Sequence, residues 1–239
     1  MIEEILQQIE HLPPVPNVVR KLQDLYYLDA YNATDIEDII MQDPNLVADI
    51  LRIVNSPLYD FSREIVDIRQ AIVLFGLEKI IEFALASFVD NLGAIDLSAY
   101  KINEQQFIRS AKQKSEITSS YVESKREKLL ASNTAFLADV SKVIIANYVK
   151  EYEINLDIDP QMVFNEVDIQ EKVALGFDTI EISALIFEKW NFDPHMIELL
   201  QTFKKRENPL QLALYNAREF TKLDGDIDKE RMEEASKES

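Results

Sequence analysis

Histidine is almost missing from this sequence: His11 and His195 are the only two among 239 residues. A metal centre with several imidazole ligands needs more than these two. Nothing in the sequence brings them together, so each is expected to be a surface or helix-capping side chain. Cysteine is absent altogether, which excludes disulfides, thiolate metal sites and cysteine nucleophiles.

Positive charge is also scarce. The 25 lysine and arginine residues are outnumbered by 43 aspartate and glutamate residues, for a net charge of −18. Nucleic-acid binding depends on neutralising phosphates with basic side chains, so this balance opposes it. The first residues, Met1-Ile2-Glu3-Glu4-Ile5, also lack the basic region of a secretion signal. We therefore expect a cytoplasmic protein with no nucleic-acid partner.

An uninterrupted membrane span is missing too. The most apolar stretch, residues 74–95, contains Glu78, Lys79, Glu82 and Asp90. A membrane span tolerates almost no charged residues of this kind. The stretch is predicted to be a buried or half-buried helix, and no membrane partner is expected.

Only four glycines occur, and repeated Asn-Gly or Asp-Gly turns are missing, which argues against a sheet-rich fold. Apolar residues recur instead with helical spacing and predict an all-α fold. Thr34 and Glu37 fit a capping box, and Asp43-Pro44 fits a helix start. A left-handed C-cap is expected at Gly76. The predicted helices cover residues 2–10, 17–27, 44–54, 67–74, 78–91, 104–128, 133–150, 168–175, 179–190, 194–203 and 209–222.

Four segments in a fixed order carry a resemblance to a known family. They are Leu12-Pro13-Pro14-Val15-Pro16, Ile40-Met41-Gln42-Asp43-Pro44-Asn45-Leu46, Leu51-Arg52-Ile53-Val54-Asn55-Ser56-Pro57-Leu58-Tyr59 and Ile68-Arg69-Gln70-Ala71-Ile72-Val73-Leu74-Phe75-Gly76. A weaker match follows at residues 181–192. On these motifs the chain resembles HDOD domains, helical modules related to the HD and HD-GYP phosphohydrolases, over most of its length up to about Leu214.

The resemblance implies an all-α, multi-helix bundle of the HDOD type over residues 1–223. An N-terminal helical lobe of about residues 1–95 is expected to pack on a degenerate HD-like lobe of about residues 104–223. Residues 224–239 are charged and lack a sustained apolar face. We expect them to form an acidic, disordered tail.

The same resemblance points to lost metal ligands. Residues 135–138 are similar to the start of the segment that carries a His-Asp doublet in active relatives, but here only Asp139 follows. Thr179 and Phe203-Lys204 stand where family members often have histidine. The resemblance therefore implies a non-catalytic protein, with no catalytic residue, no bound metal and no cofactor.

Four residues are candidates for a partner or ligand face: Asp43, Asn55, Arg69 and Trp190. Arg69 could hold a carboxylate such as that of Asp43 through paired hydrogen bonds. Asn55 is suited to a left-handed cap, and Trp190 to either a core position or ligand stacking. For each of the four, a packing role and a binding role remain open.

The resemblance implies a regulatory role in bacterial signal transduction. The expected function is a non-enzymatic intracellular domain that binds a protein partner or a small ligand. Two alternatives remain. One is a residual metal-dependent phosphohydrolase that acts on a nucleotide or cyclic dinucleotide through carboxylates. The other is a structural oligomerisation scaffold.

Overall fold

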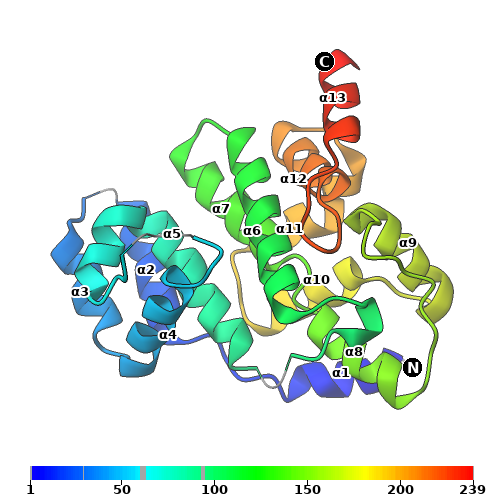
Figure 1. The fold of residues 1–239 in the computed structure, drawn as a ribbon, viewed down its shortest axis with the longest axis horizontal. Coiled ribbons are helices and arrows are strands. Elements are labelled where there is room, and N and C mark those ends of the chain that lie inside the picture. The colour runs from blue at the N-terminus through cyan, green and yellow to red at the C-terminus, as the bar shows by residue number, and fades with distance from the viewer. Residues whose placement is uncertain (1, 29, 60–62, 93–94, 239) are drawn as a thin grey trace. The chain divides into compact units, whose positions relative to one another are not determined.

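The protein is all-α, as predicted, in a computed structural model that describes residues 2–28, 30–59, 63–92 and 95–238 (Figure 1). Within that part of the chain, strand pairing is limited to two isolated bridges, Val163 with Lys222 and Thr221 with Ile227. Residues 93 and 94, next to the expected lobe boundary, lie outside the described residues.

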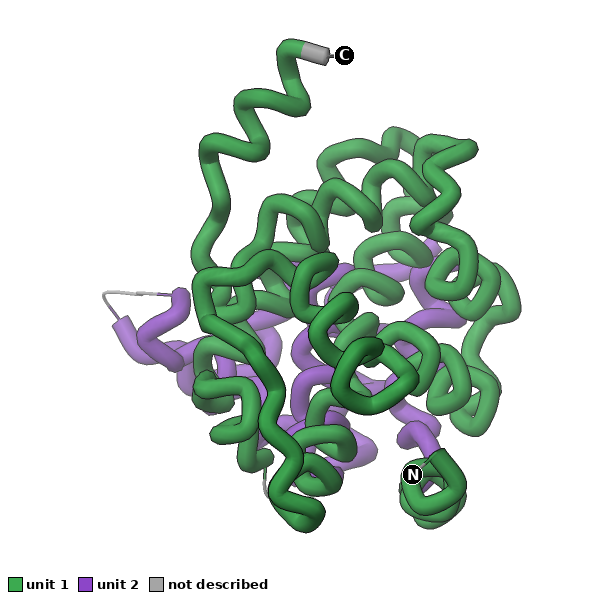
Figure 2. The backbone as a smooth tube through the Cα atoms, turned by 90° about the vertical axis from the view of Figure 1, so that its right-hand side faces the viewer, with its two compact units in different colours: residues 1–12, 95–239 green, residues 13–94 purple. Residues whose placement is uncertain are grey.

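The chain divides into two compact units, coloured separately in Figure 2. One unit is residues 13–94, and the other combines residues 1–12 with residues 95–239. The first helix, α1 (Ile2–Glu10), therefore does not belong to the N-terminal lobe of residues 1–95 that the sequence predicted. Its buried residues Ile5 and Ile9 explain the difference, because α1 packs against α8 (Lys142–Glu151) and α10 (Thr179–Lys189).

The unit of residues 13–94 packs three helices around a long one. The three are α2 (Asn17–Leu28), α3 (Ala33–Ile40) and α4 (Pro44–Val54), and the long helix that they contact is α5 (Ile68–Asp90). The predicted start of α4 is confirmed, because the Asp43 carboxylate accepts hydrogen bonds from the amides of Asn45 and Leu46. The Thr34 capping box is wrong: Asn32 caps α3, paired reciprocally with Asp35.

Gly76 adopts a positive φ, as predicted, but not as a left-handed cap. Its φ of 73° and ψ of 171° form a kink inside α5, so the predicted helices of residues 67–74 and 78–91 are two arms of one kinked helix. An extended ψ at positive φ is a region that glycine almost alone occupies. The apolar arm beyond the kink is buried at nearly every position, including Leu77, Ile80 and Ile81.

The second unit is a larger helical bundle. After α1 it contains α6 (Glu104–Ser120), α7 (Lys125–Leu137), α8, α9 (Phe164–Leu175), α10, α11 (Pro194–Thr202), α12 (Pro209–Phe220) and α13 (Lys229–Glu238), with short 3₁₀ turns at Ser98–Tyr100 and Phe203–Lys205. The helix starts predicted at residues 179, 194 and 209 are confirmed. The α6–α7 pair has the most extensive contact of any two elements, and α12 packs against both helices.

Two long predicted helices are interrupted. The prediction over residues 104–128 is wrong because the chain reverses at residues 121–124, which lets α6 and α7 pack side by side (Figure 1). The prediction over residues 133–150 is wrong because a turn at residues 138–141 separates α7 from α8. That turn contains the buried carboxylate of Asp139.

The expected disordered tail contains a helix instead, α13. Ile227 and Ala235 pack against a buried cluster of Ile117, Ala217 and Phe220. Arg231 forms ion pairs with Glu166 and Glu219. Apolar contacts and ion pairs thus hold this segment, although its charged composition predicted disorder.

The described residues include one stretch that is long and apolar enough to cross a membrane, Lys125–Glu151. It spans α7, the turn and α8, and 94% of its most apolar window is buried inside the protein. Such burial is typical of core helices.

Candidate functional site

Six ionisable side chains meet in the interior of the larger unit, and we call them the buried ion cluster. Its members are Lys114, Asp139, Lys142, Asp168, Glu171 and Arg218. All are at most 1% exposed. They come from α6, the turn between α7 and α8, α8, α9 and α12.

Arg218 joins two carboxylates. Its Nη1 donates to Asp139 Oδ2 at 2.8 Å, and its Nη2 donates to Asp168 Oδ1 at 2.6 Å. Lys114 Nζ donates to the same Oδ2 of Asp139 and lies 3.3 Å from the ring centre of Phe164. Charge-assisted bonds of this kind are strong, and an aromatic face adds further attraction for the ammonium group.

Glu171 forms the second half of the cluster. Its Oε1 accepts hydrogen bonds from Lys142 Nζ at 2.6 Å and from Tyr100 OH at 2.8 Å. Its Oε2 accepts from the Thr179 amide at 2.6 Å, and Lys142 Nζ also donates to Thr179 Oγ1 at 2.8 Å. Lys142 Nζ lies 3.8 Å from Asp139 Oδ1 and so links the two halves.

Burial dominates the electrostatics of the cluster. It raises the pKa of Asp168 to about 6 and lowers the pKa of Lys114 to about 7. Burial alone would also raise the pKa of Asp139, but the charges of Arg218, Lys114 and Lys142 hold it below its ordinary value. With three cations opposite three carboxylates, the cluster is balanced when fully ionised.

The positions at which the resemblance predicted lost metal ligands lie on or beside this cluster. Asp139 belongs to it, Thr179 bonds two of its members, and Lys204 Nζ lies 3.4 Å from Asp168 Oδ2. The residues do not fit a divalent metal, because the ammonium and guanidinium groups that pair with all three carboxylates would repel a second cation placed among them.

Sequence reasoning identified Asp139 and Thr179 but missed the three cations. Lys142 was the clearest signal available, because it stands in the largely apolar segment of residues 137–149. Lys114 and Arg218 gave no comparable signal, since each lies on a helix with other charged residues. Tertiary packing alone brings them to Asp139.

The structure corrects two details of the predicted partner face. Arg69 does not bind Asp43: it pairs with Glu37 Oε2 at 3.3 Å and Thr34 Oγ1 at 3.1 Å. Asn55 is not left-handed, since its φ is −89°. Its side chain instead donates to the carbonyl oxygen of Ile65 at 2.8 Å and accepts from that residue's amide, which fastens the loop after α4.

Trp190 is a core residue, 2% exposed, with its ring edge-to-face against Phe192. It belongs to the larger unit, whereas Asp43, Asn55 and Arg69 belong to the unit of residues 13–94. The two histidines are exposed and bond locally, His11 Nδ1 to the Gln7 carbonyl oxygen and His195 Nδ1 to Asp193 Oδ1.

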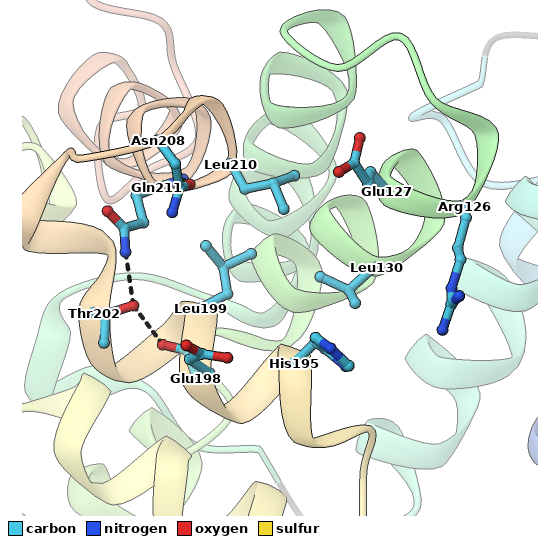
Figure 3. Close-up of a pocket in the computed structure, with 10 residues that line it drawn as sticks. All are labelled: Arg126, Glu127, Leu130, His195, Glu198, Leu199, Thr202, Asn208, Leu210 and Gln211. Atoms are coloured by element: carbon cyan, nitrogen blue, oxygen red, sulfur yellow. Dashed lines mark hydrogen bonds between the residues drawn. The ribbon is translucent and has the colours of Figure 1, made fainter.

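A pocket of about 330 Å³ lies between α7, α11 and α12 (Figure 3). Leucine side chains from all three helices converge on its centre: Leu130, Leu199 and Leu210. Its charged lining residues are Arg126, Glu127 and Glu198, and His195 lines it as well. Because charges of both signs line it, the pocket does not favour a ligand of one charge.

Solved bacterial structures share this fold. A protein from Marinobacter aquaeolei VT8, provisionally named for signal transduction, is 15% identical with a TM-score of 0.65; the match covers 95% of this chain and 54% of that one. A protein from Shewanella amazonensis SB2B, provisionally named a phosphohydrolase, is 22% identical with a TM-score of 0.59; the match covers 90% of this chain and 78% of the other.

An HDOD domain protein of unknown function from Geobacter sulfurreducens is 16% identical with a TM-score of 0.58, and the match covers 92% of this chain and 78% of that one. A search of curated proteins found no match. The family model of the HDOD domain matches residues 12–205. The helical fold, the order of the motifs and this match agree that the chain belongs to the HDOD domain family.

Proposed function

We propose that this chain is a non-enzymatic regulatory domain of signal transduction that binds a protein partner or a small ligand. The buried ion cluster is the observation that carries the proposal. Lys114, Lys142 and Arg218 supply the positive charge that a divalent metal supplies in a metal-dependent phosphohydrolase. Unlike a metal with open coordination positions, these cations cannot activate a water molecule.

The burial of the cluster also supports a role without catalysis. Asp139 and Glu171 are at most 1% exposed, and their carboxylates face protein cations and hydroxyl groups. A substrate phosphate would need access to this centre. Two comparisons favour a regulatory role: the chain belongs to the HDOD family, and the Marinobacter relative is provisionally named a signal transduction protein.

Metal content and turnover test the proposal directly. The purified chain, incubated with Mn²⁺, Fe²⁺ or Mg²⁺ and then desalted, is expected to retain no stoichiometric metal by mass spectrometry. Hydrolysis of bis(p-nitrophenyl) phosphate and of a cyclic dinucleotide should equal the buffer blank. Stoichiometric metal together with metal-dependent turnover would support the residual phosphohydrolase instead.

Partner capture tests the regulatory part. The tagged chain is recovered from its native cells beside an untagged control and analysed by quantitative mass spectrometry. A partner at near-stoichiometric abundance is expected, and Arg69→Ala tests the candidate face because its side chain is half exposed. Self-association without any partner or ligand would favour the oligomerisation scaffold.

A further inference from the structure

A second pocket, of about 340 Å³, lies within the unit of residues 13–94. The apolar part of its wall comes from three helices: Val19 from α2, Leu46 from α4, and Ala84 and Phe88 from α5. All four are at most 6% exposed. The volume is within the range of small-ligand pockets.

The charged residues that line this pocket are both acidic, Asp43 and Asp49. Asp43 uses Oδ1 to cap α4, and its Oδ2 has no partner among the described residues. The pocket thus differs from the one in Figure 3, which basic and acidic residues line together. Its charge selects for a cation.

The Asp49 carboxylate is held in place but not neutralised. Its Oδ2 accepts hydrogen bonds from Ser87 Oγ at 2.6 Å and Asn91 Nδ2 at 3.2 Å. The nearby Arg52 lies 3.5 Å from Asp49 Oδ1 but 2.9 Å from Asp90 Oδ2. Two carboxylates therefore share one guanidinium, and negative charge remains at the edge of the pocket.

We infer that this pocket binds an arginine or lysine side chain, flanked by apolar residues, on a segment of the protein partner. Such a side chain has an aliphatic stem for the apolar walls and a cationic head for the two carboxylates. The net charge of −18 attracts a basic segment of this kind over longer distances. The inference rests on the proposed function, since it names the chemistry of the partner.

An array of immobilised random peptides, probed with the full chain, tests the inference. Bound peptides are expected to be rich in arginine or lysine beside apolar residues, and their affinities are then measured in solution by calorimetry. Asp49→Asn should weaken binding about tenfold, the loss of one charge-assisted bond. Asp43→Asn removes charge while an asparagine still caps α4. Ala48→Phe, at an exposed lining position, should block the pocket without changing charge.

Asp38→Asn is the matched control, because Asp38 is an exposed carboxylate of α3 outside the pocket, and it should leave binding unchanged. Failure to bind any peptide, peptides without basic residues, or equal affinity in the pocket variants would overturn the inference. Those results leave the proposed function standing, whereas metal-dependent turnover would overturn the proposed function itself.

Discussion

At the scale of single residues, Arg218 and Arg69 both pair with carboxylates but differ strongly in burial. Arg218 is fully buried between Asp139 and Asp168, and Arg69 pairs with Glu37 with about half of its side chain exposed. Removing one partner from a buried ion pair leaves an uncompensated charge, whereas an exposed pair is screened by water. The two positions should therefore respond differently to substitution.

Arg218→Met is expected to lower the free energy of unfolding by about 3–5 kcal/mol. Arg69→Ala should lower it by less than about 1 kcal/mol. Urea unfolding followed by circular dichroism measures both. Equal losses at the two positions would mean that the cluster adds no more stability than a surface pair.

Lys114 makes the stability depend on pH. Its folded pKa of about 7 lies below the ordinary value of 10.5, so between these values the unfolded chain holds a proton that the folded chain has released. The contribution of this group to the free energy of unfolding therefore rises with pH across that window and is lost as pH falls through about 7. Asp168, with its pKa raised from 3.8 to about 6, acts oppositely: its contribution is lost as pH rises through about 6.

Urea titrations of the wild type and Lys114→Met, at pH 7 and at about pH 9, test this behaviour. The wild type should gain stability relative to the variant at the higher pH. A constant difference would show that Lys114 does not titrate in this window.

At the scale of elements, two glycines with positive φ differ in kind. Gly76 has an extended ψ of 171° within α5, and Gly176, with a ψ of −2°, is the left-handed C-cap of α9. An added Cβ meets no atom within 4 Å at either position, so only backbone conformation separates them.

Gly76→Ala is expected to lower the free energy of unfolding by about 2–3 kcal/mol, because alanine rarely occupies that region. Gly176→Ala should lower it by about 1 kcal/mol, the milder penalty of the left-handed region. Thermal and urea unfolding of both variants compare them. A larger effect at Gly176 would contradict the argument.

Helix starts were predictable where one local residue decides them, as at Asp43, Pro194 and Pro209. Asn32 and Thr34 show where such predictions fail. Both residue types cap helices, and only the folded structure shows that Asn32 caps α3. The interruptions at residues 121–124 and 138–141 were not predictable, since their causes are the packing of α6 on α7 and the burial of a carboxylate.

The site was predictable only in part for the same reason. The resemblance located Asp139 and Thr179 as positions of predicted lost metal ligands. The partners of Asp139 lie 25 and 79 residues away along the chain, at Lys114 and Arg218. No local pattern in a single sequence records such pairings.

At the scale of the whole molecule, the net charge of −18 should keep the protein from nucleic acids. No mobility shift of duplex DNA or single-stranded RNA is expected even at low salt, where phosphate contacts are strongest. A basic DNA-binding protein in the same gel is the control. A salt-sensitive shift would show that a local basic surface overrides the overall charge.

The membership of α1 in the larger unit sets an order of events during synthesis. The helix leaves the ribosome before its partners α8 and α10, which end at residues 151 and 189. At typical translation rates this delay is roughly ten to forty seconds. A nine-residue helix has only marginal stability alone, so α1 stays undocked during this delay. Helices α2 to α5, by contrast, need only one another to complete their unit. The unit of residues 13–94 can thus fold before α1 docks on the larger unit.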